Sequence, residues 1–135
     1  MSATLSGLSI ESVTLEPSFD PFIPYYEGTY AADATSLSIT FAKTSEDAVW
    51  GRSHADLMVG TVAKYLPGDE THIEAEAWNK STGTSGNVES ASYTKTINLV
   101  STADNQTLMV RVDINISVTC DGVTNRYVIK LVREE

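Results

Sequence analysis

Three kinds of feature are scarce in this chain, and each scarcity excludes a class of protein. Among 135 residues there is one cysteine, Cys120, so we expect no internal disulfide and no cysteine-ligated metal cluster. Only two histidines occur, without the HExxH spacing, which argues against a zinc site. No apolar run approaches the ~20 residues that a membrane-spanning helix requires. The sequence therefore predicts no metal, no cofactor and no insertion into a membrane.

Basic residues are also few. Nine Lys and Arg stand against 18 Asp and Glu, which gives a formal net charge of −9. Residues 1–76 hold 12 acids and 3 bases, whereas residues 77–135 hold 6 of each. Nucleic-acid binding requires clustered Lys and Arg to balance the phosphate charge. The sequence therefore predicts no nucleic acid among the partners, and the same reasoning excludes anionic membrane surfaces.

Catalytic motifs are missing as well. The chain has no GxSxG elbow, no Walker loop and no GxGxxG dinucleotide fingerprint. The letters of a Ser-His-Asp triad occur within residues 53–56, but triads are assembled from separated elements that converge in space. We therefore predict no catalytic residues and no enzymatic activity. Weak calcium binding by loop acids such as Asp69 and Glu70 stays open, because calcium needs several convergent oxygens.

Short alternating segments, punctuated by Gly, Pro, Ser and Thr, fill most of the chain. In the longest, residues 108–120, the even-numbered residues are apolar, and the odd-numbered residues from 111 to 119 are polar. This period of two indicates a strand with one buried face, and Cys120 falls in step with that face. A turn at Asp121-Gly122 and a second alternating segment at 126–133 complete a predicted antiparallel hairpin.

About eight such strands and no obvious long helix predict an all-β fold. The spacing is typical of an antiparallel two-sheet sandwich, and the length suits one domain over residues 1–135. The middle is less regular. Residues 56–66 fit a strand or a short helix, and the strand is favoured because Gly60 and its neighbours lower helix propensity. Residues 72–78 are predicted to form a strand and residues 79–87 a loop. For residues 72–78 the inward-facing side chains are expected to be Ile73, Ala75 and Ala77.

The N-terminal part combines an alternating strand with a turn rich in proline. Pro17, Pro21 and Pro24 each fix φ and remove a backbone donor, so this segment is excluded from the centre of a sheet. We expect it to carry the chain from one sheet edge to the other. Phe19 and one of the two following tyrosines are expected to anchor it to the core.

These residues resemble a known family. The opening strand has Leu5, Leu8 and Ile10; the turn has Leu15, Pro17, Phe19 and Pro21, followed by Tyr25 or Tyr26; the end has Asp121-Gly122, then Tyr127, Ile129, Leu131 and Arg133. This pattern resembles the cadherin-like β-sandwich domain, an immunoglobulin-like module of bacterial surface and phage proteins. Residues 52–88 depart from the pattern and are interpreted as an inserted hairpin or short helix.

The resemblance implies a structural or adhesive role with no catalytic residues to carry over. The leading hypothesis is a phage virion protein, for capsid decoration or the tail, that binds a protein of its assembly or another copy of itself. The alternative is a domain of a secreted bacterial surface adhesin that binds a glycan or a protein. Both place the chain on a virion or an extracellular surface. No signal peptide is recognisable, which fits a virion protein or a domain cut from a longer secreted protein.

Aromatic residues are the best candidates for a binding site. Trp50, Tyr65 and Trp78 fall in or beside the segment that departs from the family pattern. Exposed aromatic rings on a β-surface suit stacking on carbohydrate or packing against a protein. The competing interpretation is that the two tryptophans belong to the core of the sandwich, because tryptophan is usually highly buried.

Overall fold

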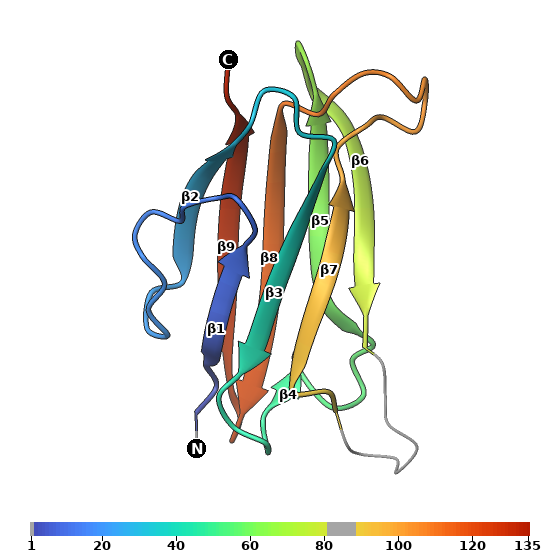
Figure 1. Cartoon of the computed structure of the whole chain (residues 1–135). Helices are drawn as coiled ribbons and strands as arrows, with labels where there is room; N and C mark the ends of the chain where they lie inside the picture. The colour runs from blue at the N-terminus through green and yellow to red at the C-terminus, as the bar shows by residue number, and fades with distance from the viewer. Residues whose placement is uncertain (1, 81–88) are drawn as a thin grey trace.

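Two β-sheets make up the computed structural model, which describes residues 2–80 and 89–135, and their strands pair antiparallel except for β2 with β9. The smaller sheet has the strand order β1-β3-β7, and the larger has the order β2-β9-β8-β5-β6, with β4 paired to β8 (Figure 1). The strands are β1 (Leu5–Ile10), β2 (Tyr25–Tyr30), β3 (Ser36–Lys43), β4 (Val49–Trp50), β5 (Met58–Leu66), β6 (Asp69–Asn79), β7 (Ser92–Asn98), β8 (Arg111–Cys120) and β9 (Val123–Arg133). No helix occurs in the described residues, so the predicted all-β class is confirmed. The described residues form nine strands, where about eight were expected.

The C-terminal hairpin forms as the alternation predicts. β8 and β9 pair along their whole length, from Arg111 opposite Val132 to Cys120 opposite Val123. The even-numbered residues of β8 are buried and its odd-numbered residues up to Ser117 are partly exposed. Asp121 and Gly122 both have positive φ, 52° and 78°, which the tight turn requires. The Cys120 thiol is free and buried, as its place in the alternation predicts.

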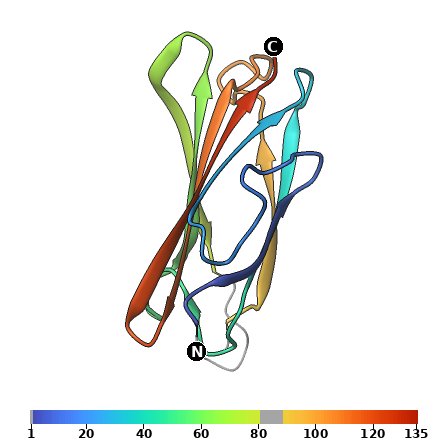
Figure 2. The ribbon, with the colours of Figure 1, turned by 90° about the vertical axis from the view of Figure 1, so that its left-hand side faces the viewer.

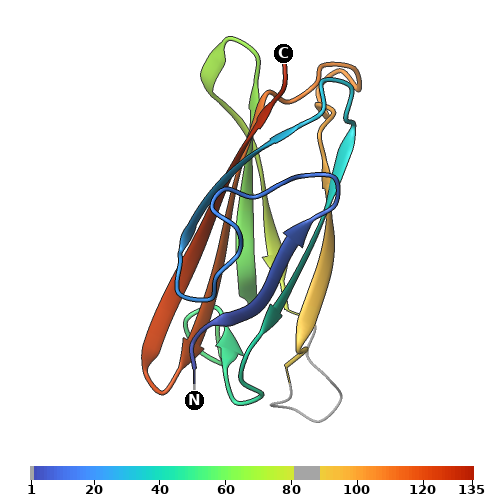
Figure 3. The ribbon, with the colours of Figure 1, turned by 60° about the vertical axis from the view of Figure 1, so that its left-hand side comes forward.

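The proline-rich segment joins the two sheets. β1 lies at the edge of the smaller sheet, whereas β2 lies at the edge of the larger sheet and runs parallel to β9. The connection passes along the side of the sandwich (Figures 2 and 3). Phe19 packs 6.0 Å from the ring of Tyr26, whose hydroxyl donates to the Asp20 carbonyl at 2.6 Å. The predicted crossover and its aromatic anchors are therefore confirmed.

The middle of the chain forms strands of the larger sheet. β5 pairs with β8 on one side and with β6 on the other, so the alternative of a short helix is wrong. The facing predicted for β6 is also wrong: Ile73 and the two alanines that follow it at every second position are exposed. In the observed register Ile73 lies opposite Tyr65, and Trp78 lies opposite Gly60. The even-numbered residues from Glu74 to Trp78 therefore lie on the side of β6 that faces the core.

Four aromatic rings join the sheets at one end of the core. Phe41 and Tyr93 come from the smaller sheet, and Trp50 and Trp78 come from β4 and β6. Phe41 lies at the centre: its ring centroid is 5.4 Å from Trp50, 5.8 Å from Trp78 and 5.8 Å from Tyr93. Edge and offset contacts at such distances stabilise by about 0.5–1.5 kcal/mol each beyond burial alone. This cluster fastens the two layers without a disulfide.

None of the described residues belongs to a helix of the length and apolarity needed to span a membrane.

Candidate binding surface

Of the three aromatic candidates, two are in the core. Trp50 is fully buried, and its indole N–H donates to the Ser90 carbonyl at 2.7 Å. Trp78 is 6% exposed, and its indole N–H donates to a carboxylate oxygen of Glu76 at 3.2 Å. The competing interpretation, that both tryptophans are core residues, thus matches the observed burial. Tyr65 alone among the three presents its ring at the surface.

Tyr65 belongs to the side of the larger sheet that faces away from β1, β3 and β7, which we call the outer face. The outer face consists of Tyr25, Glu27 and Thr29 on β2; Arg126, Val128, Lys130 and Val132 on β9; Arg111, Asp113, Asn115 and Ser117 on β8; Thr61, Ala63 and Tyr65 on β5; and Ile73, Ala75 and Ala77 on β6. The strand registers align these side chains in rows across the sheet, because residues opposite one another point to the same face. The β5–β6 half is made mainly of small residues, and the β8–β9 half is charged and polar.

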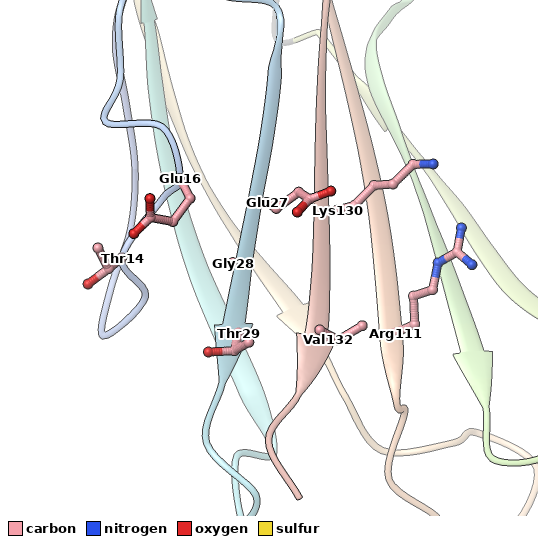
Figure 4. A pocket seen from close by; sticks show the side chains of 8 residues that line it. All are labelled: Thr14, Glu16, Glu27, Gly28, Thr29, Arg111, Lys130 and Val132. Carbon is pink, nitrogen blue, oxygen red and sulfur yellow. The ribbon is translucent and has the colours of Figure 1, made fainter.

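An upper groove crosses the outer face where β2 meets β9. It has a volume of about 590 Å³, and its lining includes Glu16, Glu27, Arg111, Lys130 and Val132. Glu16 lies on one side of β2, and Arg111, Lys130 and Val132 lie on the other (Figure 4). Glu16 therefore lies toward the crossover segment, whereas Glu27 extends over β9 beside the bases.

Hydrogen bonds and ring contacts order the side chains around the upper groove. The Arg111 guanidinium donates to both carboxylate oxygens of Asp113, at 3.0 and 2.7 Å, and lies 4.7 Å from the centroid of Tyr65. The Tyr25 hydroxyl donates to Glu27 at 3.0 Å, and this bond raises the pKa of Tyr25. Arg111 is thus held in place by a bidentate pair and a stacked ring.

A lower groove of about 540 Å³ lies farther along β8 and β9, toward the Asp121-Gly122 turn. Its floor and walls are Gly51, Arg52, Asp56, Met58, Val59, Gly60, Thr61, Asn115, Ser117, Thr124 and Arg126. Asp56 is the one carboxylate in this lining. It accepts backbone N–H bonds from Met58 at 3.0 Å and Arg52 at 3.1 Å, and these bonds lower the pKa of Asp56. The remaining polar lining is dominated by arginine, amide and hydroxyl groups.

The distribution of cations explains why the whole-chain charge is a poor guide. Three of the nine Lys and Arg residues are exposed, namely Arg52, Arg126 and Lys130, and all three line the grooves of the outer face. Lys43 and Lys64 are buried and bonded to backbone carbonyls. The exposed cations are therefore confined to one face, which also carries the carboxylates of Glu27 and Asp113. Sequence reasoning missed these residues, although the polar odd-numbered side of 111–119 marked the face.

A second charged cluster lies at the end of the core, beside Trp50. The carboxylate of Glu89, with 1% of its side chain exposed, lies 3.0 Å from the Lys80 ammonium and 3.0 Å from His54 Nδ1. Its other oxygen accepts the backbone N–H of Trp50 at 2.8 Å. Since His54 pairs with Glu89 and Asp56 pairs with backbone groups, the triad letters at 53–56 form no triad. This cluster joins Lys80 directly to Glu89.

No group of three or more His, Cys, Asp or Glu side chains suited to a metal ion occurs in residues 2–80 and 89–135. Asp69, one of the acids for which the sequence leaves weak calcium binding open, lies in β6 rather than in a loop.

Comparison with known proteins does not assign this chain to a family. No family model matches the chain, and no curated protein matches it. A search of solved structures finds the alkylpurine DNA glycosylase AlkC of Pseudomonas fluorescens bound to DNA containing an abasic site analog. The match has 11% sequence identity and a TM-score of 0.39, and it covers 95% of this chain. This chain spans about 30% of the length of that protein.

This match contradicts three predictions from the sequence. The matched protein is an enzyme, which stands against a non-enzymatic phage virion or adhesin module and against the prediction of no enzymatic activity. It is bound to DNA, which stands against the exclusion of nucleic acid from the partners. These predictions are not retained. A TM-score of 0.39 carries no argument for DNA repair by this chain, and the expected location on a virion or cell surface stays a prediction.

Proposed function

We propose that the sandwich has immunoglobulin-like topology and that the cadherin-like resemblance reflects this fold. The strand order supports the proposal. β1, β3 and β7 correspond to strands A, B and E of an immunoglobulin domain, and β9, β8, β5 and β6 correspond to G, F, C and C′. The buried ring of Trp50 packs against Phe41 of β3 and so helps to join the two sheets.

We propose that the chain is a binding module that takes an anionic ligand on the β8–β9 half of the outer face. The single observation that supports this is that the exposed cations Arg52, Arg126 and Lys130 all line the grooves of one face, where Arg126 has no carboxylate partner among the described residues. The Debye length is about 8 Å at physiological ionic strength, so acids elsewhere on the molecule are largely screened from these grooves. The cations and the carboxylates that line the grooves, Glu16, Glu27 and Asp56, then decide which ligands are attracted.

The outer face has room for a ligand longer than one ionic group. Lys130 and Arg126 lie four residues apart on the same strand, which is about 13 Å at the usual rise per residue. On the neighbouring strand, Asn115 lies between them, Ser117 lies opposite Arg126 and Asp113 lies opposite Lys130. A neutral donor between two cations is suited to an elongated, multiply charged anion.

The test is an NMR titration of the ¹⁵N-labelled chain with inorganic polyphosphate at low salt. We expect amide shifts on β8 and β9 that saturate and that disappear as the salt concentration is raised. The double variant K130E/R126E is expected to lose the shifts. The variant K95E, which changes a cation on β7 of the smaller sheet, is the matched control and is expected to keep them. Shifts that are absent, or that are spread over both sheets, would overturn the proposal.

A further inference from the structure

The lower groove is a rigidly built pocket rather than a loose surface hollow. The Gly51 N–H donates to the Ser117 carbonyl at 2.8 Å, and the Thr119 hydroxyl donates to the Gly51 carbonyl at 2.7 Å. Gly51 has a φ of +76°, so glycine is favoured there. At Gly60, a Cβ atom would collide with the carbonyl oxygen of Asn115, so β5 and β8 approach as closely as a backbone allows. The walls are therefore fixed before any ligand arrives.

The donors of the lower groove converge from two neighbouring strands. Arg126 on β9 lies directly opposite Ser117 on β8, and Asn115 lies two residues farther along the same face. Side chains opposite one another in such a pair have Cβ atoms about 5 Å apart. In the part of the chain that the structure describes, no carboxylate pairs with the Arg126 guanidinium. Its five N–H donors are free for a ligand.

Thr124 and Asp56, two other polar residues of the groove, already bond to groups of the protein. Their bonds limit which ligands the groove can bind. The Thr124 hydroxyl lies 2.7 Å from the Thr119 hydroxyl, whose proton goes to the Gly51 carbonyl. Thr124 therefore donates to Thr119 and has no proton left for a ligand. Asp56 is occupied by backbone N–H groups and lies 3.8 Å from the exposed Arg52 guanidinium, so the charge of Arg52 offsets its own. The uncompensated charge of the groove is that of Arg126.

We propose that the lower groove binds a tetrahedral oxyanion, a phosphate or sulfate group, held by Arg126 with the Ser117 hydroxyl and the Asn115 amide as further donors. This rests on the proposed function and names its principal subsite. A guanidinium fork binds two oxygens of such an anion, and donors from a second direction suit its remaining oxygens better than the two of a carboxylate. The volume falls within the range of about 300–1,000 Å³ typical of ligand pockets, so the anion is one group of a larger molecule.

The probes are inorganic phosphate, inorganic sulfate, a hexose phosphate and acetate, each titrated into the ¹⁵N-labelled chain at constant ionic strength. We expect saturable shifts at the amides of residues 51, 52, 117 and 126 with the three tetrahedral anions. The hexose phosphate should bind at least tenfold more tightly than inorganic phosphate if the ligand is a phosphate ester, and equally if it is the free anion. Acetate should shift these amides at least tenfold less.

Two variants separate charge from geometry. R126Q is expected to weaken phosphate binding at least tenfold, and R126K, which keeps the charge but loses the fork, about threefold to tenfold. S117A removes one hydroxyl without changing the charge and is expected to weaken binding about threefold. K95Q, on β7 of the smaller sheet, is the matched control with no expected effect.

The results distinguish this inference from the proposed function. If polyphosphate shifts β8 and β9 but phosphate leaves residues 51, 52, 117 and 126 unmoved, the oxyanion subsite is wrong and the anion-binding face stands. If R126Q and K95Q reduce phosphate binding equally, the effect comes from net charge and the subsite is wrong. If neither polyphosphate nor phosphate binds, both proposals are wrong.

Discussion

The two faces of the six-stranded sheet are built from the same strands but differ in role: the inner face packs in the core, and the outer face presents polar groups to solvent. On β8 the inner face consists of Val112, Ile114, Ile116 and Val118, each fully buried. The outer face of the same strand carries Arg111, Asp113, Asn115 and Ser117, which are partly exposed. The difference shows that a period of two places packing on one set of positions and solvent-facing polar groups on the other. Substitutions on the two faces should therefore affect different measurements.

The charged groups of the molecule divide in the same way. Lys80 and Glu89 are buried against each other, with 2% and 1% of their side chains exposed, and both have further hydrogen-bond partners. Arg52 and Arg126 are exposed on the lower groove. Charges that are buried and fully bonded serve to hold the fold together, whereas exposed cations with open donors are available to a ligand.

The largest effect is expected from the aromatic cluster on the inner side. Trp50→Ala removes a fully buried ring and two ring contacts, so the free energy of unfolding should fall by about 3–5 kcal/mol. Urea denaturation followed by circular dichroism measures the change. Ile73→Ala, an apolar truncation on the outer face where the side chain is 44% exposed, is the matched control and should cost less than about 1 kcal/mol. Equal losses of unfolding free energy in the two variants would contradict the inferred difference between the two faces.

The next effect concerns the buried ion pair. Glu89→Gln leaves the Lys80 ammonium buried without its counter-ion, which should lower the free energy of unfolding by about 3 kcal/mol. Glu27→Gln, a carboxylate on the outer face, should change it by less than about 0.5 kcal/mol. Chemical denaturation of both variants at pH 7 checks this. A loss below about 1 kcal/mol for Glu89→Gln would show that the Lys80–Glu89 pair is solvated and that it does not hold the fold together.

Much of the fold could be predicted because its signals are local. The alternation of residues 108–120, the Asp121-Gly122 turn and the three prolines each act through their own neighbours, and each formed as expected. The facing of β6 could not be predicted, because its residues are apolar or small on one side and include Glu74, Glu76 and Trp78 on the other. Which side of β6 is buried depends on its pairing with β5 and on the packing of the sheets, which the residues of β6 alone do not reveal.

The candidate surface was harder to predict for the same reason. Arg126 and Ser117 become neighbours only through the register of the β8–β9 hairpin, and Arg52 reaches them only because β4 pairs with β8. The net charge of the chain adds these cations to acids that lie far from them in the structure, so it does not reveal where the exposed cations lie. The tryptophans were candidates on residue type alone, and burial against Phe41 removed them from the surface.

A smaller effect is expected at high pH, from the inner side. Tyr30 is buried and its hydroxyl donates to the Met109 carbonyl; burial raises the pKa of Tyr30 from 10.0 to about 12. The unfolded chain then loses this proton first, so stability is constant below pH 10 and falls as the pH rises toward 12, by at most about 2 kcal/mol. Burial also raises the pKa of Tyr26 and of Tyr127, which adds to the decline.

Denaturation of the wild-type chain and of Tyr30→Phe at pH 8 to 11.5 measures this contribution. The variant lacks the titrating hydroxyl, so its stability should decline less steeply above pH 10, whatever its stability at pH 8. In Tyr25→Phe, on the outer face, the lost hydroxyl is exposed and its pKa is raised mainly by the bond to Glu27, so the decline should become less steep by a smaller amount than in Tyr30→Phe. Identical slopes for Tyr30→Phe and the wild type would mean that the Tyr30 hydroxyl ionises as readily in the folded chain as in the unfolded one.

The smallest effect is expected at the outer-face ring contact. Arg111 stacks on Tyr65 at 4.7 Å in a partly exposed position, where a cation–π contact contributes about 0.5–1 kcal/mol. A double-mutant cycle with Tyr65→Leu and Arg111→Met, measured by urea denaturation, should therefore give a coupling energy of that size. Both single variants should keep the wild-type circular dichroism spectrum, because neither side chain touches the core cluster. A coupling energy near zero would mean that Arg111 is positioned by Asp113 alone, and that the outer face owes its order to ion pairing rather than to its aromatic residues.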